Sequence, residues 1–243
     1  MDTEAAIVIP PSAFATLVAD SATRRGSRSL NADAVATRTD PASGRVAFAV
    51  ADGIGDHLLA ARAARVAAAA AALAATRQGA RAGILAAQQQ LLHEFPEPQA
   101  DCVLVVAVLP GPGLPDLPTD IAWVGDCRAY RWNDRMLHQI TSDHTVAEYL
   151  RARGIQAAPR LSHVVTTSVR TVQPEAVGHA ATGSSHGRLL LCTDGAHKPL
   201  TMPAIKHALS RAATPAIAAN LLVDSALRAG GSDNSTAIVI DRH

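Results

Sequence analysis

Residues 46–77 read VAFAVADGIGDHLLAARAARVAAAAAALAATR, and this stretch decides the fold class. Its first six residues form an apolar segment that favours a strand, which runs straight into the pair Asp52-Gly53. From about residue 57 to 77, alanine, leucine and arginine predict a helix, because all three are strong helix formers. A second helix is expected over about 81–94. Two consecutive helices between strands predict an antiparallel helix pair laid on a sheet.

The segments on either side of this stretch predict further strands and helices. Strands are expected at 14–19, 34–38, 102–109 and 188–194, a meander of three strands at 121–126, 127–132 and 136–141, and a last strand at 235–240. Helices are expected at 145–153, 202–211 and 214–229, and 155–187 is irregular. This order is not a regular βαβ alternation. It predicts an α+β fold in one domain, 1–243: a β-sandwich of two mainly antiparallel sheets flanked by pairs of α-helices.

The composition narrows the class of protein. The chain has 243 residues, 48% of them hydrophobic and 3% aromatic, so it can bury a core of small aliphatic side chains and offers few rings for stacking on bases. The formal net charge is +1 and no run of Lys and Arg exceeds two residues. We therefore expect no nucleic-acid partner.

Three sequence features predict where the protein works. The cysteines, Cys102, Cys127 and Cys192, are odd in number and form no CxxC pair, which indicates a reducing compartment. The segment MDTEAAIVIPPSAF has no basic region and contains two prolines, unlike a secretory signal. The most apolar helical stretch, 66–75, is too short and too alanine-rich to span a bilayer. We expect a cytoplasmic protein with no membrane partner.

Aspartates recur where an apolar strand meets a polar loop. These are Asp33, Asp52, Asp126, Asp194 and Asp233. Mg²⁺ and Mn²⁺ prefer oxygen ligands, and carboxylates gathered without cations would repel one another or take up protons. A pair of metal ions removes that cost and lowers the pKa of a bound water. The alternative for any single site is that Asp-Gly and Asp-Asn are turn dipeptides. Their joint occurrence favours a metal centre.

Seven segments in this order resemble the PP2C (PPM) family of metal-dependent serine/threonine protein phosphatases, in its compact bacterial form. The segments are RSLNADAV, FAVADGIGDH, VLVVAVL, IAWVGDCRAYRW, ITSDHT, LLLCTDG and GGSDNSTAIVI, and the resemblance covers roughly residues 14–240. It implies an enzyme of signal transduction that hydrolyses phosphoserine and phosphothreonine in proteins. The implied partners are phosphorylated protein substrates and a cognate Ser/Thr kinase, and the implied state is a monomer.

The resemblance also implies two Mn²⁺ or Mg²⁺ ions as cofactors. Asp52 would bridge both ions, and Asp194 and Asp233 would complete the first site, so these three form the catalytic set. Asp33 and the backbone carbonyl of Gly53 would serve the second ion.

Two further positions match the family. Asp126, together with Asp194, matches the place that can hold a third, weaker ion. Arg28 stands five residues before Asp33, where the family has the arginine that binds substrate phosphate. A guanidinium fork suits this role because it meets phosphate oxygens in pairs.

The chain departs from the family pattern at three places. Ala32 stands where the family commonly has Glu, Asp56 replaces a usual glycine beside the metals, and Ala100-Asp101-Cys102 replaces a Gly-Thr-Thr signature. These departures keep a second hypothesis open: a pseudophosphatase that binds phosphoproteins or regulates a partner without turnover. A third hypothesis is a hydrolase of small phosphate esters.

Histidines and cysteines near these motifs have two interpretations each. His57 is either a general acid for the leaving seryl oxygen or, as we expect, a residue at the start of a helix. His144 is expected to be structural. Cys127 and Cys192 lie near the aspartates, and strand cysteines of this kind are usually buried and apolar in behaviour rather than redox-active.

Overall fold

Two antiparallel sheets of five strands each lie face to face in the computed structural model, which describes residues 17–112, 114 and 116–243. In strand order, the first sheet contains β1 (Leu17–Arg24), β10 (Ser235–Arg242), β9 (Gly187–Cys192), β6 (Arg128–Trp132) and β7 (Leu137–Gln139). The second contains β2 (Asp33–Thr39), β3 (Val46–Gly53), β4 (Cys102–Leu109), β5 (Asp120–Val124) and β8 (Gly178–Ala181).

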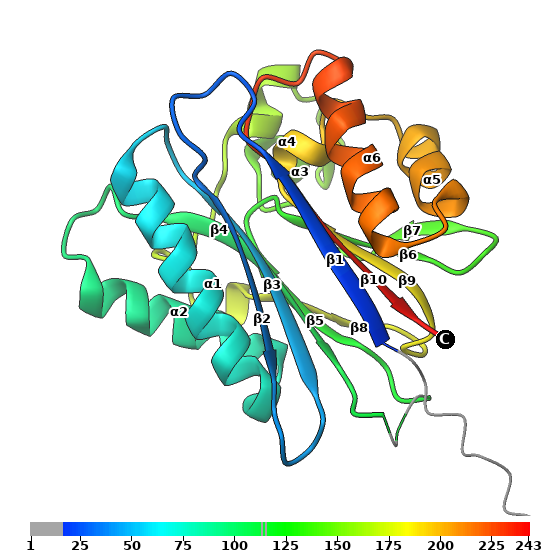
Figure 1. Ribbon diagram of the computed structural model, residues 1–243. Helices are drawn as coiled ribbons and strands as arrows, with labels where there is room; N and C mark the ends of the chain where they lie inside the picture. Colours follow the sequence, from blue (N-terminus) through cyan, green and yellow to red (C-terminus); the bar gives the residue numbers. More distant parts are fainter. Residues whose placement is uncertain (1–16, 113, 115) are drawn as a thin grey trace, which may run out of the picture.

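Paired helices cover the outer face of each sheet (Figure 1). The second sheet carries α1 (Leu58–Gln78) and α2 (Ala80–Glu94), and the first carries α5 (Met202–Arg211) and α6 (Pro215–Arg228). Shorter elements are α3 (Val146–Arg151), α4 (Asp194–His197) and the 3₁₀ turns η1 (Pro159–His163) and η2 (Pro174–Ala176). The four layers confirm the predicted α+β sandwich flanked by helix pairs.

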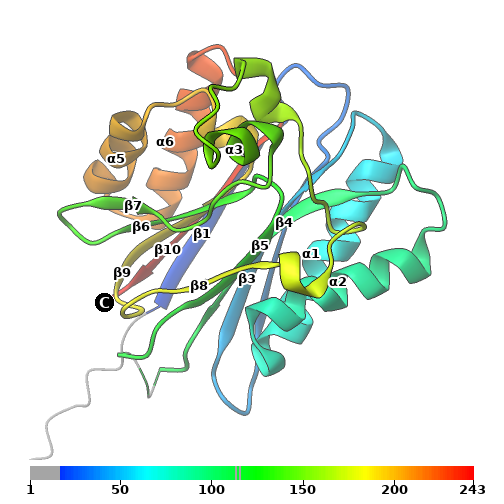
Figure 2. The same ribbon diagram turned by 180° about the vertical axis from the view of Figure 1, so that it is seen from behind.

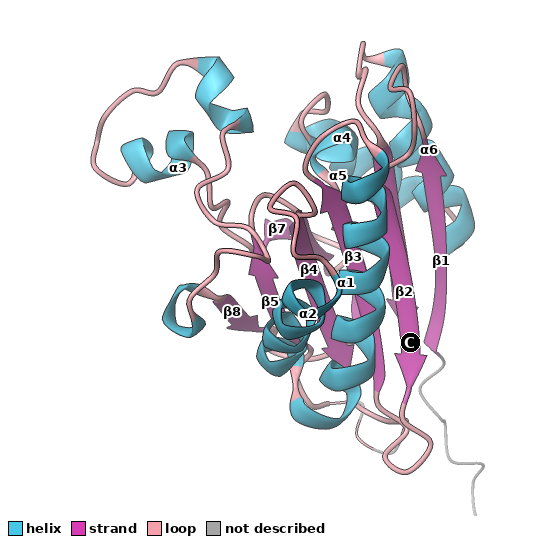
Figure 3. Cartoon of the chain, turned by 90° about the vertical axis from the view of Figure 1, so that its left-hand side faces the viewer, coloured by secondary structure: helices cyan, strands magenta, loops and turns pink. Residues whose placement is uncertain are grey.

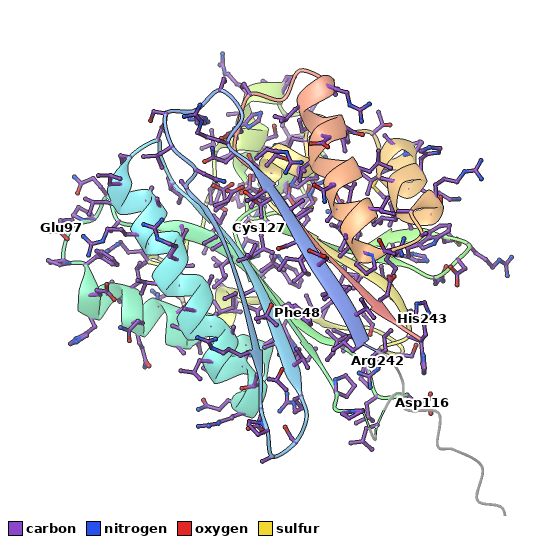
Figure 4. All side chains as sticks on the ribbon, viewed as in Figure 1. Phe48, Glu97, Asp116, Cys127, Arg242 and His243 are labelled. Atoms are coloured by element: carbon purple, nitrogen blue, oxygen red, sulfur yellow. The ribbon has the colours of Figure 1, made fainter. Side chains whose placement is uncertain are left out.

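Three apolar cores hold these layers together. The central core joins the two sheets through side chains that alternate inward along the strands, among them Phe48, Val105 and Ile238. Figure 4 shows Phe48 inside the molecule between the sheets, whereas Asp116 lies at the periphery. The outer cores lie under α1 and α2 on one side and under α5 and α6 on the other.

Helix α1 contains the alanine run. Its N-cap is His57, whose Nδ1 accepts the Ala60 N–H at 3.1 Å. Small side chains let α1 approach α2 closely: a Cβ added at Gly83 would lie 2.8 Å from the Ala71 oxygen. By length and composition alone α1 could cross a membrane, but half of its most apolar window is buried in the protein, against the sheet and α2.

The structure corrects three expectations about local elements. Of the strand expected at 14–19, residues 14–16 lie outside the described residues; β1 extends past residue 19 to Arg24, because the polar residues there pair with β10. The expected meander is wrong at its first step, since β5 and β6 lie in different sheets; the chain changes sheet at Gly125, which has φ +88°. The irregular segment 155–187 contains β8. The expectation for MDTEAAIVIPPSAF concerns residues outside the described part.

Candidate metal and phosphate site

Asp33 and Asp52 face each other across neighbouring strands. The antiparallel register of β2 and β3 pairs them directly, so both side chains lie on the same face of the second sheet. Asp33 opens β2, and Asp52 is the second-last residue of β3. The apolar residues that follow Asp33 and precede Asp52 therefore fix the two carboxylates at one end of the sandwich.

Asp194 and Asp233 come to this end from the first sheet. Asp194 follows β9 and Asp233 precedes β10, and these strands are adjacent. The Thr193 N–H donates to the Thr236 oxygen at 3.0 Å, which continues the pairing of the two strands beside the aspartates. Asp194 and Asp233 are 39 positions apart in sequence, but they lie close together at the ends of two adjacent strands.

The glycines after Asp52 and Asp194 have a packing role. A Cβ at Gly53 would lie 2.5 Å from the Ala60 oxygen, and a Cβ at Gly195 would lie 1.9 Å from the Asn234 oxygen. Neither glycine has a positive φ. The turn-dipeptide interpretation therefore does not explain these two glycines, which are needed because other backbone segments approach the aspartates closely.

A cleft of about 180 Å³ opens at this end of the sandwich. Its lining includes most of the residues that the sequence singled out: Arg28, Asp52, Gly53, Asp126, Asp194 and Asp233, together with Asp56 and His163. Asp33 lies behind this surface, where its carboxylate faces Thr193 and interacts electrostatically with Asp194 and Asp233. The fold thus gathers every candidate ligand and the candidate phosphate-binding arginine in one region.

Burial makes this region unfavourable for negative charge in the absence of ions. Asp33 accepts a hydrogen bond from Thr193 Oγ1 at 2.9 Å through Oδ2, while its Oδ1 is buried without a partner in the described part of the chain. Burial is the main cause that raises the pKa of Asp33 to about 7. Burial, and then the charges of Asp33 and Asp194, raise the pKa of Asp52 well above its ordinary value.

Two basic side chains already neutralise part of the cluster. The Lys198 ammonium lies 2.6 Å from Asp126 Oδ2 and 2.8 Å from Asp194 Oδ2. Burial opposes ionisation of Asp194, but Lys198 holds the pKa of Asp194 below its ordinary value. At the rim, Arg28 Nη2 donates to Asp233 Oδ2 at 2.7 Å, with 43% of the Arg28 side chain exposed.

The remaining donors suit divalent cations of the Mg²⁺ and Mn²⁺ type. All are oxygens, and the buried Oδ1 of Asp33, which has no hydrogen-bond partner among the described residues, lies beside the Asp52 carboxyl, whose pKa is raised; a divalent cation suits such a pair. Across the described residues, no three acidic, imidazole or thiol groups converge tightly enough to be a preformed metal site. Lys198 and Arg28 direct oxygens of Asp126, Asp194 and Asp233 toward themselves. The residues fit metal ions, and ligation would require some of these oxygens to turn.

The loop that carries Arg28 is fixed from two sides. Asn234 holds it to the start of β10, since its Nδ2 donates to the oxygens of Arg25 and Leu30 at 2.7 and 2.9 Å. Asp56 holds the other side: its carboxylate accepts the Ser29 N–H at 3.0 Å and the Ser29 hydroxyl at 2.7 Å. These hydrogen bonds place the Arg28 guanidinium at the mouth of the cleft.

The three departures from the family pattern have distinct structural consequences. Asp56 lines the cleft, but its oxygens are engaged by the Arg28 loop, which explains an acid at this position. Ala32 is buried with Ala60 and Ala61 in a small apolar cluster, so this position supplies no carboxylate. Asp101 accepts from Ser168 Oγ at 2.5 Å and from the Arg170 N–H at 3.0 Å.

Asp101 thereby anchors one end of a projecting segment, residues 145–170, here called the flap. Figure 3 shows α3 and the 3₁₀ turn after it standing away from the two sheets. Figure 2 shows the chain running from there toward α2, where Gln88 Nε2 donates to the oxygens of Arg170 and Val172. His163 on the flap reaches the cleft, with Nδ1 3.8 Å from Asp194 Oδ2.

The structure settles the open interpretations of the histidines and cysteines. His57 caps α1, as expected, and His144 is structural, with Nδ1 accepting the Gly125 N–H at 3.3 Å. All three cysteines are free and buried. Burial raises the pKa of Cys192 to about 12 and the pKa of Cys127 well above its ordinary value. These thiols are therefore poor nucleophiles at neutral pH.

Sequence reasoning missed Lys198, His197, His163, Thr193 and Asn234. His197 is buried, its Nε2 lies 3.0 Å from the Asp126 oxygen, and burial lowers its pKa to about 4. For Lys198 a signal was present, since it stands one helical turn after Asp194, at i+4. Thr193 and Asn234 are sequence neighbours of Asp194 and Asp233, whereas only the fold brings His163 to the cleft.

Comparison with known proteins relates the chain to serine/threonine phosphatases. No protein-family model matches the chain. The serine/threonine protein phosphatase PstP of Mycobacterium tuberculosis is 32% identical over 126 residues, which is 49% of this chain and 24% of that protein. The chain thus matches about a quarter of the length of this curated relative.

Solved structures match nearly the whole chain. The catalytic domain of PstP in complex with two manganese ions is 30% identical, with a TM-score of 0.71 over 93% of this chain and 99% of that one. The phosphatase Stp1 of Staphylococcus aureus has the same fold, with 23% identity and a TM-score of 0.80 over 93% and 95% of the two chains.

Proposed function

Since the chain belongs to the PPM family of serine/threonine phosphatases, we propose that it removes phosphate from phosphoserine and phosphothreonine in proteins, with two Mn²⁺ or Mg²⁺ ions at its aspartates. The observation that carries this proposal is the facing pair Asp33 and Asp52, in which Asp33 Oδ1 has no hydrogen-bond partner among the described residues, next to a cleft whose mouth holds Arg28.

The aspartates supply the ligands for the ions. Asp52 would bridge the two, Asp194 and Asp233 would complete the first site, and Asp33 with the Gly53 carbonyl would serve the second. When bound, such ions activate a water for attack on phosphorus and offset charge on the phosphoryl oxygens. Asp33 and Asp52 are half-buried at the base of the cleft, where their attraction for a cation is stronger than it would be in bulk water.

Arg28 would bind and orient the substrate phosphate. A guanidinium has five N–H donors, and the contact with Asp233 is through Nη2, so donors remain for phosphate oxygens. The charge on a phosphoryl group in transfer lies on its equatorial oxygens, which is where a fixed guanidinium is effective. The hydrogen bonds of Asn234 and Asp56 to the loop hold Arg28 in place before substrate arrives.

Hydrolysis of a phosphothreonine peptide tests this proposal. We expect turnover that requires Mn²⁺ or Mg²⁺ and is abolished in Asp52→Asn. Arg28→Ala should lower kcat/KM about a hundredfold, as expected for the loss of hydrogen bonds to a charged group. Arg38→Ala, an exposed arginine on β2, is the matched control. A folded protein without turnover across titrations of both metals would refute the proposal.

One observation favours a pseudophosphatase as the second candidate. Lys198 and Arg28 already neutralise three of the five aspartates, and Ala32 adds no ligand, so the fold can persist without ions. This candidate predicts binding to a phosphoprotein that EDTA leaves unchanged, with no turnover. A hydrolase of small phosphate esters would instead prefer an aryl phosphate to the phosphopeptide.

The cellular setting is proposed on the same basis. We propose phosphoprotein substrates made by a cognate Ser/Thr kinase, a monomeric state and a cytoplasmic location. The three buried free thiols support a reducing compartment. Light scattering of the purified chain tests the monomer, and fractionation of the source cells tests the location.

A further inference from the structure

We infer that the Lys198 ammonium takes the place of a divalent cation between Asp126 and Asp194, so that the protein binds two metal ions and excludes a third. This inference rests on the proposed metal-dependent function. It adds that the Lys198 side chain supplies one of the positive charges in the proposed metal centre. On this inference, the Lys198 side chain occupies the position where the family resemblance implied a third, weaker metal ion.

The contacts of Lys198 are those of a cation shared by two carboxylates. Its Nζ lies 2.6 Å from Asp126 Oδ2 and 2.8 Å from Asp194 Oδ2, and only 14% of its side chain is exposed. An ammonium is a compact point charge, which is the shape of charge that a metal ion presents to carboxylate oxygens. The five aspartates therefore divide into three groups: Asp126 and Asp194 share the Lys198 ammonium, Asp233 pairs with the Arg28 guanidinium, and Asp33 and Asp52 have no ion pair with any basic side chain among the described residues.

The local structure holds Lys198 in this place. Asp194 begins α4 and Lys198 follows it by four residues, so both side chains lie on the same side of one helical turn. The Lys198 N–H donates to the Asp194 oxygen at 2.8 Å. The preceding residue, His197, contacts the Asp126 oxygen through Nε2 at 3.0 Å. Residues 197 and 198 together therefore fix both the backbone and the carboxylate of Asp126.

The use of basic residues supports the same conclusion. Of the 22 Lys and Arg residues, only Lys198 and Lys206 are lysines. The chain thus uses arginine for nearly every positive charge, yet has lysine where the space between two buried carboxylates is narrow. A planar guanidinium is wider than an ammonium and would not present a single charge to both oxygens in the same way.

An additional ion at Asp126 would have to displace this ammonium or lie beside it. Two positive charges a few ångströms apart in a partly buried site repel each other strongly. Displacing the ammonium would move a buried charge away from both partners, which is costly as well. Metal ions are therefore expected at Asp33 and Asp52, completed by Asp194 and Asp233, and not at Asp126.

Counting bound Mn²⁺ by equilibrium dialysis tests the inference without relying on activity. Wild type should bind two ions per chain, and Lys198→Asp, which replaces the cation by a further oxygen ligand beside Asp194, should bind one more. The matched control is Lys206→Asp, at the other lysine, which is exposed on α5 and lies over the Trp132 ring. It should bind the same number of ions as wild type.

The outcomes separate the inference from the function on which it rests. Wild type that binds three ions would overturn the inference alone, and this measurement requires no variant to fold. A folded Lys198→Asp protein that binds no more Mn²⁺ than wild type would overturn it as well. Wild type that binds no Mn²⁺ would overturn both the inference and the metal-dependent function. Anomalous scattering from Mn²⁺-soaked crystals should place the additional ion of Lys198→Asp next to Asp126.

Discussion

The substitution Asp33→Asn should stabilise the metal-free protein at pH 8. Burial, the leading cause, raises the pKa of Asp33 from 3.8 to about 7, so the ionised carboxylate is less favourable in the folded state than in the unfolded one. Asparagine has nearly the same shape, retains an oxygen that can accept from Thr193 Oγ1, and carries no charge.

The sign and size of the effect follow from linkage. Between pH 3.8 and about 7 the folded state binds more protons at Asp33 than the unfolded state, so stability is greatest at low pH and falls as pH rises through this window. Above about 7 the loss is complete. At 1.36 kcal/mol per pKa unit, the ionised Asp33 costs about 4 kcal/mol at pH 8 and about 2 kcal/mol at pH 5.

Urea unfolding in EDTA measures this difference. We expect Asp33→Asn to exceed wild type in free energy of unfolding by up to about 4 kcal/mol at pH 8 and by roughly half as much at pH 5. Asp116→Asn, whose parent side chain is 94% exposed, is the control and should have no such effect. Excess Mn²⁺ should stabilise wild type more than Asp33→Asn, since a ligand of the folded state adds to its stability. If Asp33→Asn raised the free energy of unfolding equally at both pH values, or not at all at pH 8, the charge on Asp33 would not be what destabilises the folded protein.

Three other predictions test the surroundings of the site. Asp56→Gly removes the hydrogen bonds to Ser29 that hold the Arg28 loop, so kcat/KM for a phosphopeptide should fall about tenfold, mainly through a higher KM; an unchanged KM would contradict this role for Asp56. Asp101→Ala frees the end of the flap from β4 and should lower the free energy of unfolding by about 1–3 kcal/mol and speed proteolysis within 145–170; cleavage at the wild-type rate would argue against the anchor. The three cysteines should not react with a thiol reagent until the protein unfolds, because all are buried and burial raises the pKa of Cys192 to about 12; rapid labelling of the native protein would disprove this.

Local patterns in the sequence determined most of the fold. The continuous apolar run at 102–109 could only be a buried strand, and the alanine-rich stretch after His57 could only be a helix, because propensity and periodicity agree there. The sequence also marked the five aspartates, since each stands where an apolar strand meets a polar loop, and the resemblance to the phosphatase family added Arg28.

The failures occurred where a long-range contact decides the local structure. Polar residues after Leu17 form a strand because they pair with β10, more than two hundred residues away. The chain leaves one sheet for the other at Gly125, a position that a run of short apolar segments does not reveal. Such choices depend on tertiary pairing rather than on local preference.

The sequence alone therefore indicated candidate metal ligands, because oxygen ligands are recognisable by type, and the family resemblance added Arg28 as a candidate for binding phosphate. Only the tertiary structure decided how they are used. It opposed Asp33 and Asp52 across two strands, turned the Asp56 carboxylate toward Ser29, and placed the Lys198 ammonium between Asp126 and Asp194. The physical reason is that charges act over a few ångströms in a buried site, and those distances exist only after distant segments have packed together.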